Sequence, residues 1–356
     1  MSSKAEDLKF AGRKAAGRSL GRMPARLVDA AERAIGPYEL DGYRLDPHLR
    51  LAMKAAAAEP SIDTLDPVEA RRTSKAGFAA SNAQRVEGVS VTPTIIPDPK
   101  HGDLDARVYT PAGASAQPRP GVLFLHQGGW VIGDLDTCDT FCTQLASGLD
   151  AIVVSLDYRL APEHRFPTQN ENVDAAWDWM IEAAPHLGID PAQMVVCGDS
   201  AGGQLSASLC QRLRDAGRPN PAAQALIYPT VDLAAKSGSM ISCADAFPLT
   251  ANIGRYFVSF ALPEGADHND PAYSPAQHPH LEGLAPAIII TAAFDILRDQ
   301  GLAFAKQLDA AGVPVISRLE PEMSHSFISM GALSPAAYEA SERIVADIAT
   351  VLKAGK

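Results

Sequence analysis

Three side chains in this sequence could together perform nucleophilic catalysis, and the first is a serine in a strand–turn–helix pattern. Ser200 lies within Gly198-Asp199-Ser200-Ala201-Gly202, after the apolar run Met194–Cys197 and before a helical pattern that starts at Gln204. This is the context of a nucleophile elbow. Small residues flank the serine because larger side chains would collide in so sharp a turn. The turn would raise the hydroxyl above the sheet edge and point a helix N-terminus at developing negative charge.

A serine nucleophile needs a base, a group that orients the base, and hydrogen-bond donors for the oxyanion. In an open α/β sheet these groups belong on loops at the carboxyl ends of strands. Only three of the nine histidines, His126, His164 and His325, directly follow a predicted core strand or lie in the loop after it. His325 also completes the chain order serine, aspartate, histidine that accompanies such an elbow. We therefore predict that His325 is the base.

The predicted orienting acid is Asp295, which follows the apolar run Ala287–Thr291 and precedes a helical pattern at Leu297–Leu308. Its carboxylate would lie at the end of the next-to-last strand, within reach of an imidazole. A helix N-cap is the alternative role, and one aspartate can fill both. Asp299 competes for the assignment, but it lies one helical turn further on and would point along the helix.

Consecutive glycines follow the apolar run Gly121–Leu125. Gly128 and Gly129 would let bare backbone N–H groups approach a substrate oxygen. Ala201, directly after the serine, should supply a third amide, so the predicted oxyanion hole is Gly128, Gly129 and Ala201. We expect His126 to brace this loop by hydrogen bonds rather than to transfer protons.

Apolar runs alternate with helical patterns through most of the chain. Eight stretches are predicted to be strands: Gly88–Ile96, Asp105–Tyr109, Gly121–Leu125, Ala151–Leu156, Met194–Cys197, Ala225–Tyr228, Ala287–Thr291 and Val313–Leu319. Five helical patterns lie between most of them or after the last: Thr137–Leu149, Asn170–Ala184, Gln204–Ala216, Gly301–Ala311 and Pro335–Lys353. Continuous apolar strands interleaved with helices predict an α/β fold, with a mostly parallel sheet covered on both faces. No helix separates the first two strands, so that end of the sheet should be antiparallel.

The sequence divides into a helical N-terminal segment and a larger α/β domain with one interruption. Three helical patterns and no strand pattern are found in residues 1–85: Ala25–Ala34, Leu45–Ala57 and Val68–Ser74. Residues 86–232 and 266–356 form the predicted catalytic domain. Residues 233–265 break the strand–helix rhythm and contain a helical pattern at Thr250–Ala261. We expect this insertion to pack with the N-terminal segment as a cap.

Composition excludes several classes of protein. The chain has 356 residues, an apolar fraction of 46% and a net charge of −11, which argues against nucleic acid or an anionic membrane as the main partner. No apolar run is long enough to span a bilayer. Five cysteines without Cys-x-x-Cys spacing are typical of buried thiols in a reducing compartment, so we expect a cytoplasmic protein.

Two further patterns carry less information. Basic residues are frequent near the N-terminus: Lys4, Lys9, Arg13, Lys14, Arg18, Arg22 and Arg26. No apolar segment follows them, and Glu6 and Asp7 disfavour a mitochondrial presequence, so a surface helix is the preferred interpretation. Cys138 and Cys142 lie one helical turn apart without nearby histidines, and no phosphate loop or dinucleotide motif occurs. No metal and no cofactor are predicted.

With these residues assembled, the sequence from about Leu45 to the C-terminus resembles the hormone-sensitive-lipase-like (family IV) esterases of the α/β-hydrolase superfamily. Four motifs carry the resemblance: His126-Gln127-Gly128-Gly129-Trp130, Asp157-Tyr158-Arg159-Leu160-Ala161-Pro162-Glu163, Gly198-Asp199-Ser200-Ala201-Gly202-Gly203 and Asp295-Ile296-Leu297-Arg298-Asp299. The resemblance implies the same nucleophile, base, acid and oxyanion donors, a helical cap, and a homodimer. It also implies that Asp157–Glu163 is a structural loop braced by arginine and carboxylate.

The sequence departs from this family at two positions. Gln127 stands where the family has the first glycine of His-Gly-Gly-Gly, and Ser326 stands where glycine usually follows the catalytic histidine. Gln127 restricts the backbone and adds a polar side chain near the acyl site. We expect Gln127, Trp130 and Asp199 to lie next to the substrate.

The predicted activity is serine carboxylesterase action on short- to medium-chain acyl esters, through an acyl-enzyme intermediate. An amidase or lactonase would use the same triad, so the sequence does not separate these reactions. A non-catalytic small-molecule receptor on the same fold is the alternative from another class, and the presence of all three triad residues argues against it.

Overall fold

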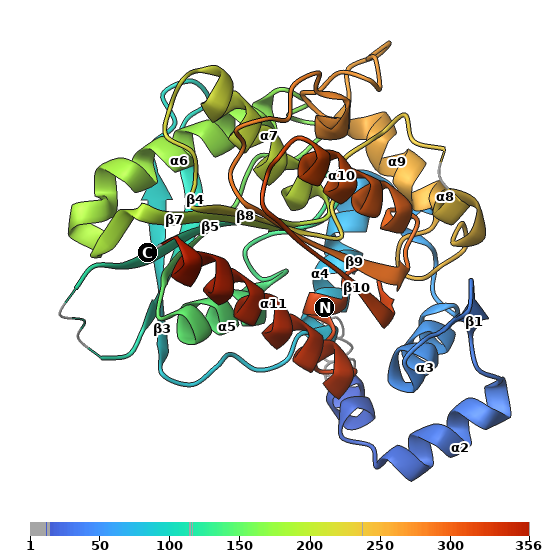
Figure 1. The fold of residues 1–356 in the computed structure, drawn as a ribbon. Coiled ribbons are helices and arrows are strands. Elements are labelled where there is room, and N and C mark those ends of the chain that lie inside the picture. The colour runs from blue at the N-terminus through green and yellow to red at the C-terminus, as the bar shows by residue number, and fades with distance from the viewer. Residues whose placement is uncertain (1–11, 13–14, 114, 116, 237, 356) are drawn as a thin grey trace, which may run out of the picture.

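The computed structural model describes residues 12, 15–113, 115, 117–236 and 238–355. Eight strands form one sheet in the order β10-β9-β8-β7-β5-β6-β4-β3 (Figure 1). Their bounds are β3 Val89–Ile96, β4 Leu104–Pro111, β5 Arg119–Leu125, β6 Ile152–Leu156, β7 Ile189–Asp199, β8 Ala223–Ile227, β9 Ala287–Phe294 and β10 Val315–Ser324. The strands from β10 to β6 pair in parallel, whereas β4 is antiparallel to both of its neighbours. The predicted mostly parallel sheet with an antiparallel end is confirmed.

Helices cover both faces of this sheet. The helices that follow or separate its strands are α5 Asp139–Leu149, α6 Thr168–Leu187, α7 Ala201–Asp215, α10 Arg298–Ala310 and α11 Pro335–Ala354. The helices α6, α7 and α10 lie on one face, and α5 and α11 lie on the other (Figure 1). Alternate residues of the central strand β5 divide between the two cores: Leu123 and Leu125 face the first, and Val122 and Phe124 the second. Burial on both faces explains why these strands are continuously apolar in the sequence.

The N-terminal segment is helical apart from one short hairpin. Its elements are α2 Ala25–Ile35, β1 Glu39–Leu40, β2 Tyr43–Arg44, α3 Pro47–Ala56, η1 Ile62–Thr64 and α4 Pro67–Ser81. The expectation that this segment has no strand is wrong, because β1 and β2 pair antiparallel around Asp41-Gly42. Both turn residues have positive φ, 53° and 82°, as a tight hairpin turn requires. The helix predicted at Val68–Ser74 is also longer, and it begins where Asp66 accepts hydrogen bonds from the first free N–H groups.

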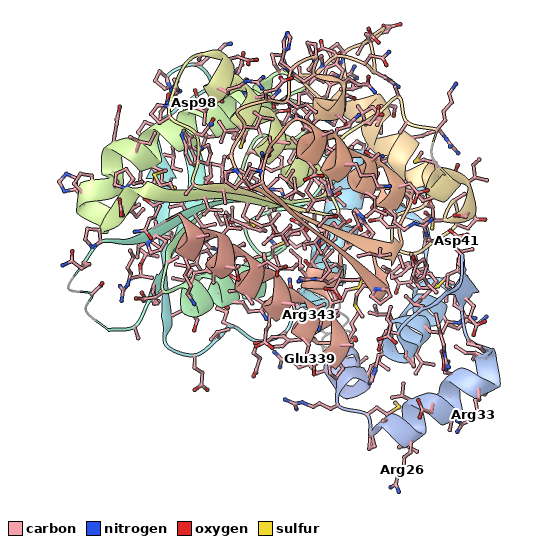
Figure 2. The ribbon with its side chains drawn as sticks, in the orientation of Figure 1. Arg26, Arg33, Asp41, Asp98, Glu339 and Arg343 are labelled. Carbon is pink, nitrogen blue, oxygen red and sulfur yellow. The ribbon has the colours of Figure 1, made fainter. Side chains whose placement is uncertain are left out.

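The insertion after β8 approaches the N-terminal segment. It contains α8 Gly238–Ser242 and α9 Ala251–Ala261, followed by η2 Pro275–Gln277. The helix α9 contacts η1, and Asp41 accepts hydrogen bonds from Ser242 in the insertion and from Arg298 at the start of α10. Asp41 thus lies where the hairpin meets the rest of the molecule (Figure 2). These contacts support the expected cap, which stays a prediction.

The basic N-terminal stretch can be followed only in part. Lys4, Lys9, Arg13 and Lys14, with Glu6 and Asp7, lie outside the described residues. Residues 15–21 are helical, and Arg26 and Arg33 project outward from α2 (Figure 2).

The five cysteines are all buried and unpaired with one another. Within the described part of the chain, no helix is both long and apolar enough to cross a membrane.

Candidate active site

The structure brings the three predicted catalytic side chains together at the carboxyl ends of the strands. Nε2 of His325 lies 2.9 Å from the Ser200 hydroxyl oxygen, and Nδ1 lies 2.6 Å from Oδ2 of Asp295. All three residues are buried, with at most 5% of their surface exposed. The other two histidines considered for the base lie elsewhere: His164 is exposed, and His126 is bonded to its own loop. The hydroxyl, the imidazole and the carboxylate contact one another in this order, so the imidazole can accept the proton of the serine hydroxyl.

The sharp turn at Ser200 depends on the absence of side chains around it. Ser200 has φ 55° and ψ −115°, a strained conformation between the last residue of β7 and the first of α7. A Cβ atom at Gly198 would lie 2.3 Å from the carbonyl oxygen of Gly202, and one at Gly202 would lie 1.9 Å from that of Leu125. The turn is held from outside by the Ser200 N–H, which donates to the Ile227 carbonyl of β8 at 2.8 Å. The glycines of this motif are therefore a packing requirement.

The N-cap alternative for Asp295 is wrong, because the residue that precedes α10 is Leu297 and no side chain caps this helix. Asp295 lies instead beside the imidazole of His325. Its Oδ1 accepts the N–H of Leu297 at 2.9 Å, while its Oδ2 faces His325. The carboxylate is thus fixed at the entrance to α10, and its second oxygen orients the imidazole. Asp299 points elsewhere, since it accepts hydrogen bonds from the Ser239 N–H and from Arg298.

The glycine loop after β5 packs tightly against two neighbours. Gly128 has φ 131°, and a Cβ there would lie 2.0 Å from the Ile132 carbonyl oxygen. Gly129 has φ 58°, and a Cβ there would lie 2.1 Å from Cγ of Phe257 in α9. Both positions therefore require glycine, for conformation as well as for space. Ala201 begins α7, where N–H groups have no acceptor inside the helix.

His126 braces this loop. Its Nδ1 lies 2.7 Å from the Gln127 carbonyl oxygen, and its ring stacks on Tyr158 with centroids 4.3 Å apart. The Tyr158 hydroxyl donates in turn to the His126 carbonyl at 2.7 Å. Burial lowers the pKa of His126, which keeps the ring neutral in this position.

The three side chains expected next to the substrate are engaged within the protein. Trp130 is buried and donates from its indole N–H to Oε1 of Gln204 at 3.0 Å. The Gln127 carboxamide contacts Ser326 and Ser329. Asp199 is completely buried beside the nucleophile, and Tyr228 donates to its Oδ2 at 3.0 Å. In this structure, all three side chains form hydrogen bonds with other side chains of the protein.

Asp199 has an unusual environment for a carboxyl group. Burial raises its pKa to about 7, against the opposing effects of the Tyr228 hydrogen bond and the nearby His325. The thiol of Cys138 lies 3.6 Å from Oδ1. The Tyr228 ring also lies 4.8 Å from the His325 ring. Tyr228 therefore contacts both the Asp199 carboxyl group and the His325 ring.

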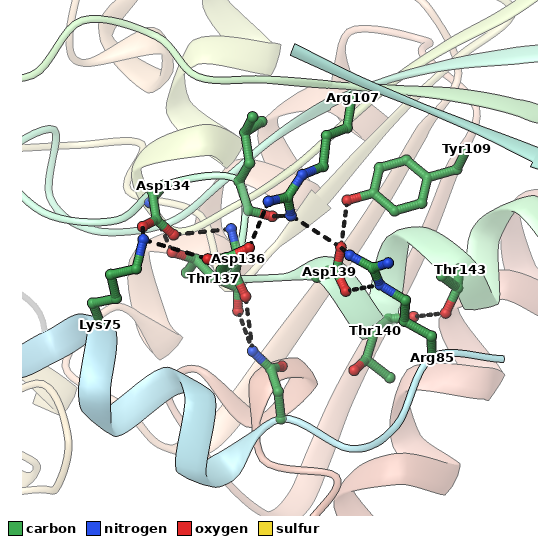
Figure 3. Close-up of polar contacts among 12 residues, drawn as sticks. Lys75, Arg85, Arg107, Tyr109, Asp134, Asp136, Thr137, Asp139, Thr140 and Thr143 are labelled. Carbon is green, nitrogen blue, oxygen red and sulfur yellow. Dashed lines mark hydrogen bonds and ion pairs between the residues drawn. The ribbon is translucent and has the colours of Figure 1, made fainter. Parts of the chain in front are cut away.

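Ion pairs fix the segment that follows the glycine loop to the N-terminal segment (Figure 3). Lys75 of α4 lies 2.6 Å from Asp134, and Arg85 donates to Asp139 at 2.9 Å. Arg107 of β4 completes the cluster through Asp139 at 3.2 Å. The segment that follows the glycine loop is thus anchored by charged residues from two separate parts of the chain.

Arg71 of α4 connects the same loop to the segment implied to be structural. Its guanidinium donates to the carbonyl oxygens of Val131 and Ala161, at 2.8 and 2.7 Å, and to Glu163 at 2.8 Å. Within the segment, Arg159 donates to the carbonyls of residues 102 and 103. Arg71, which forms an ion pair with Glu163 of this segment, therefore comes from α4 and lies outside the segment.

Sequence reasoning missed several residues around the site. Tyr228 ends a predicted strand next to the elbow strand, and that position was a usable signal. Phe257 and Arg71 carry no such signal, because only the packing of the helices brings them to the glycine loop. Among the residues that the structure describes, no three histidine, cysteine, aspartate or glutamate side chains are grouped so as to hold a metal ion.

Comparison with known proteins identifies the family. A family model described as alpha/beta hydrolase fold matches residues 122–329, which is more than half of the chain. The chain belongs to the α/β-hydrolase family. The predicted resemblance to hormone-sensitive-lipase-like enzymes and the predicted fold are confirmed.

Relatives of this α/β-hydrolase include enzymes with described activities. It is 38% identical to the carboxylic ester hydrolase LipN of Mycobacterium tuberculosis, over 86% of this chain and 82% of that protein. It is 36% identical to an ethyl acetate hydrolase of Pseudomonas putida, over 68% of this chain and 77% of that protein. Among solved structures, the ester hydrolase EH1AB1 from the metagenome of Lake Arreo, in complex with a bipyridine phosphonate derivative, matches with a TM-score of 0.83 and 34% identity. That match covers 86% of this chain and 98% of the other.

Proposed function

We propose that this α/β-hydrolase is a carboxylic ester hydrolase that uses Ser200, His325 and Asp295 as its catalytic residues. The observation that carries the proposal is the continuous contact from hydroxyl to imidazole to carboxylate, at 2.9 and 2.6 Å. The names of its relatives, a carboxylic ester hydrolase and an ethyl acetate hydrolase, support the same reaction class.

The reaction is acyl transfer in two steps. His325 removes the hydroxyl proton as the Ser200 oxygen attacks the ester carbonyl, and Asp295 stabilises the imidazolium that forms. The amides of Gly128, Gly129 and Ala201 hold the oxyanion. His325 then gives the proton to the leaving alcohol, and water repeats the sequence on the acyl-enzyme to release the acid.

The direct test is loss of the nucleophile together with covalent labelling. Ser200→Ala should lower kcat on a short acyl ester by about four to six orders of magnitude, with an unchanged circular dichroism spectrum. An organophosphonate should modify the wild-type protein at Ser200 and leave the variant unlabelled. Ester hydrolysis by Ser200→Ala at near wild-type rate would refute the proposal. A wild-type protein that is neither labelled nor active would favour the receptor alternative.

A matched pair of aspartates tests the assignment of the acid. Asp295→Asn should lower kcat by orders of magnitude, because the amide no longer stabilises the imidazolium. Asp299→Asn, four residues further along the chain, should keep kcat within a few-fold of the wild-type value, because the Asp299 carboxylate accepts hydrogen bonds from Ser239 and Arg298. The reverse result would move the role to Asp299.

The substrate class we propose is short- to medium-chain acyl esters. Phe257 of α9 lies directly against Gly129, so the proposed oxyanion loop is covered by the inserted segment. A covered site favours small substrates over long acyl chains. Amide and lactone substrates use the same chemistry and belong in the same assay panel. A homodimer and a cytoplasmic location, implied by the resemblance and by the cysteines, are retained as proposals.

A further inference from the structure

Gln127 and Ser326 are the two residues that differ from the motifs of the family that the sequence resembles, and the structure brings their side chains into direct contact. The Ser326 hydroxyl donates a hydrogen bond to Oε1 of Gln127. The two residues are 199 positions apart in the chain, and both are buried, with 2% and 6% of their surface exposed. A glycine at either position would leave the other side chain without this partner.

The second end of the Gln127 carboxamide is held as well. Its Nε2 donates to the Ser329 hydroxyl at 3.0 Å, and that hydroxyl donates to the Thr137 carbonyl at 3.0 Å. Ser329 ends the short helix η3, Phe327–Ser329, which follows the His325 loop. Thr137 belongs to the segment that the ion pairs of Figure 3 fix in place. The carboxamide therefore spans two loops, and each of its ends is satisfied.

The contact joins the two halves of the proposed catalytic machinery. Gln127 directly precedes Gly128, whose amide is proposed to hold the oxyanion, and Ser326 directly follows His325. Ser326 has φ 66° and ψ 15°, so the chain turns immediately after the imidazole. Acyl transfer needs the imidazole and the oxyanion donors in a fixed relative position, and an error of about 1 Å can cost about 100-fold in rate.

We propose that Gln127 and Ser326 are a pair of positioning residues that hold the oxyanion loop and the His325 loop in register. The inference rests on the proposed ester hydrolysis. It accounts for both departures together, because the two side chains supply each other's buried hydrogen bond.

A double-mutant cycle tests the pair. Gln127→Met keeps the length of the side chain and removes both of its polar atoms, and Ser326→Ala removes the hydroxyl. Each single variant should lower kcat on a short acyl ester by about tenfold and leave KM within about twofold, because substrate contacts are retained while alignment is lost. The double variant should also lose about tenfold, since the second change removes a contact already broken.

The chain offers a matched control for a purely structural role. Ser341 of α11 donates to Oε1 of Gln144 in α5 at 2.9 Å, a buried hydroxyl–carboxamide bond between two helices outside the site. Ser341→Ala and Gln144→Met should lower the melting temperature and leave kcat unchanged. Melting temperatures measured for all variants separate unfolding from misalignment.

Two results for kcat would overturn the inference. One is a kcat within twofold of wild type for Gln127→Met or Ser326→Ala, and the other is a loss of about 100-fold in the double variant, which would mean that the two side chains act independently. A rise in KM with unchanged kcat would also contradict it, because it would indicate substrate contact. Failure of the proposed function is read separately, from absent phosphonate labelling of the wild-type protein, and the inference would fall with it.

Discussion

Replacement of Asp199 by asparagine should make the stability of this protein less dependent on pH. Asp199 is completely buried, and its carboxyl group has one hydroxyl donor, Tyr228 at 3.0 Å. Burial raises its pKa to about 7. The ionised carboxylate is therefore costly in the folded protein, whereas in the unfolded chain it is hydrated.

The size of the effect follows from the two pKa values. An aspartate in the unfolded chain has a pKa of about 3.9, about three below the value in the folded protein. This difference means that the folded protein binds the proton more tightly by about 4 kcal/mol. Because the folded pKa is the higher one, the associated stability is present below about pH 4 and is lost as the pH rises through about 7. Between pH 5 and pH 8 the free energy of unfolding should fall by about 3 kcal/mol from this group alone.

Urea unfolding of the wild-type protein and of Asp199→Asn at pH 5, 6, 7 and 8 measures this pH-dependent part of the free energy of unfolding. Asparagine stays neutral, so the variant should become more stable relative to wild type by about 3 kcal/mol between pH 5 and pH 8. Asp157, whose pKa burial also raises to about 7, titrates in both proteins and cancels in the difference. A difference that stays constant across this range, to within about 0.5 kcal/mol, would show that Asp199 does not hold a proton near neutral pH and would refute the reasoning.

Two further predictions concern activity. Gly128→Ala should lower kcat by at least about 100-fold, because its methyl group would lie 2.0 Å from the Ile132 carbonyl oxygen; Gly312→Ala, at φ 79° in open space, is the control that should change only stability. Butyrate-length esters should be hydrolysed faster than palmitate-length esters, and faster palmitate turnover in the same assay would contradict a covered site.

The arrangement of the sheet could be predicted because its central strands are buried on both faces. Each such strand is a continuous apolar run, and the loop after it lies at the same edge of the sheet, which is how the sequence could place Asp295 and His325 near Ser200. The prediction was less accurate where polar residues enter a strand. The edge strand β10 continues to Ser324, past its predicted end at Leu319, because Glu320 is buried there against Arg343 at 2.6 Å. Hydrophobic pattern alone cannot detect a strand residue that is buried through an ion pair.

Contacts between distant parts of the chain account for most of what the sequence did not reveal. Phe257 is one apolar residue of a helix, and nothing in its spacing indicates that it covers Gly129. Asp41-Gly42 forms a hairpin turn only because two strands of two residues each pair across it, and such short strands leave no pattern in the sequence. These features are specified by tertiary packing, which local periodicity does not encode.

Gln127 and Ser326 show what this means for reading a motif. Taken one at a time, each is a departure that puts part of the site in doubt: a bulky polar side chain in a glycine loop, and a serine at positive φ. Taken together they form one hydrogen bond, so the cost of burying each polar group is offset by the other. A related chain with glycine at both positions leaves no polar group of this pair buried without a partner, whereas one with glycine at only one of them buries an unsatisfied polar group. We therefore expect related chains to carry glycine at both positions or a bonded pair at both, and frequent mixed combinations with a retained site would contradict that reasoning.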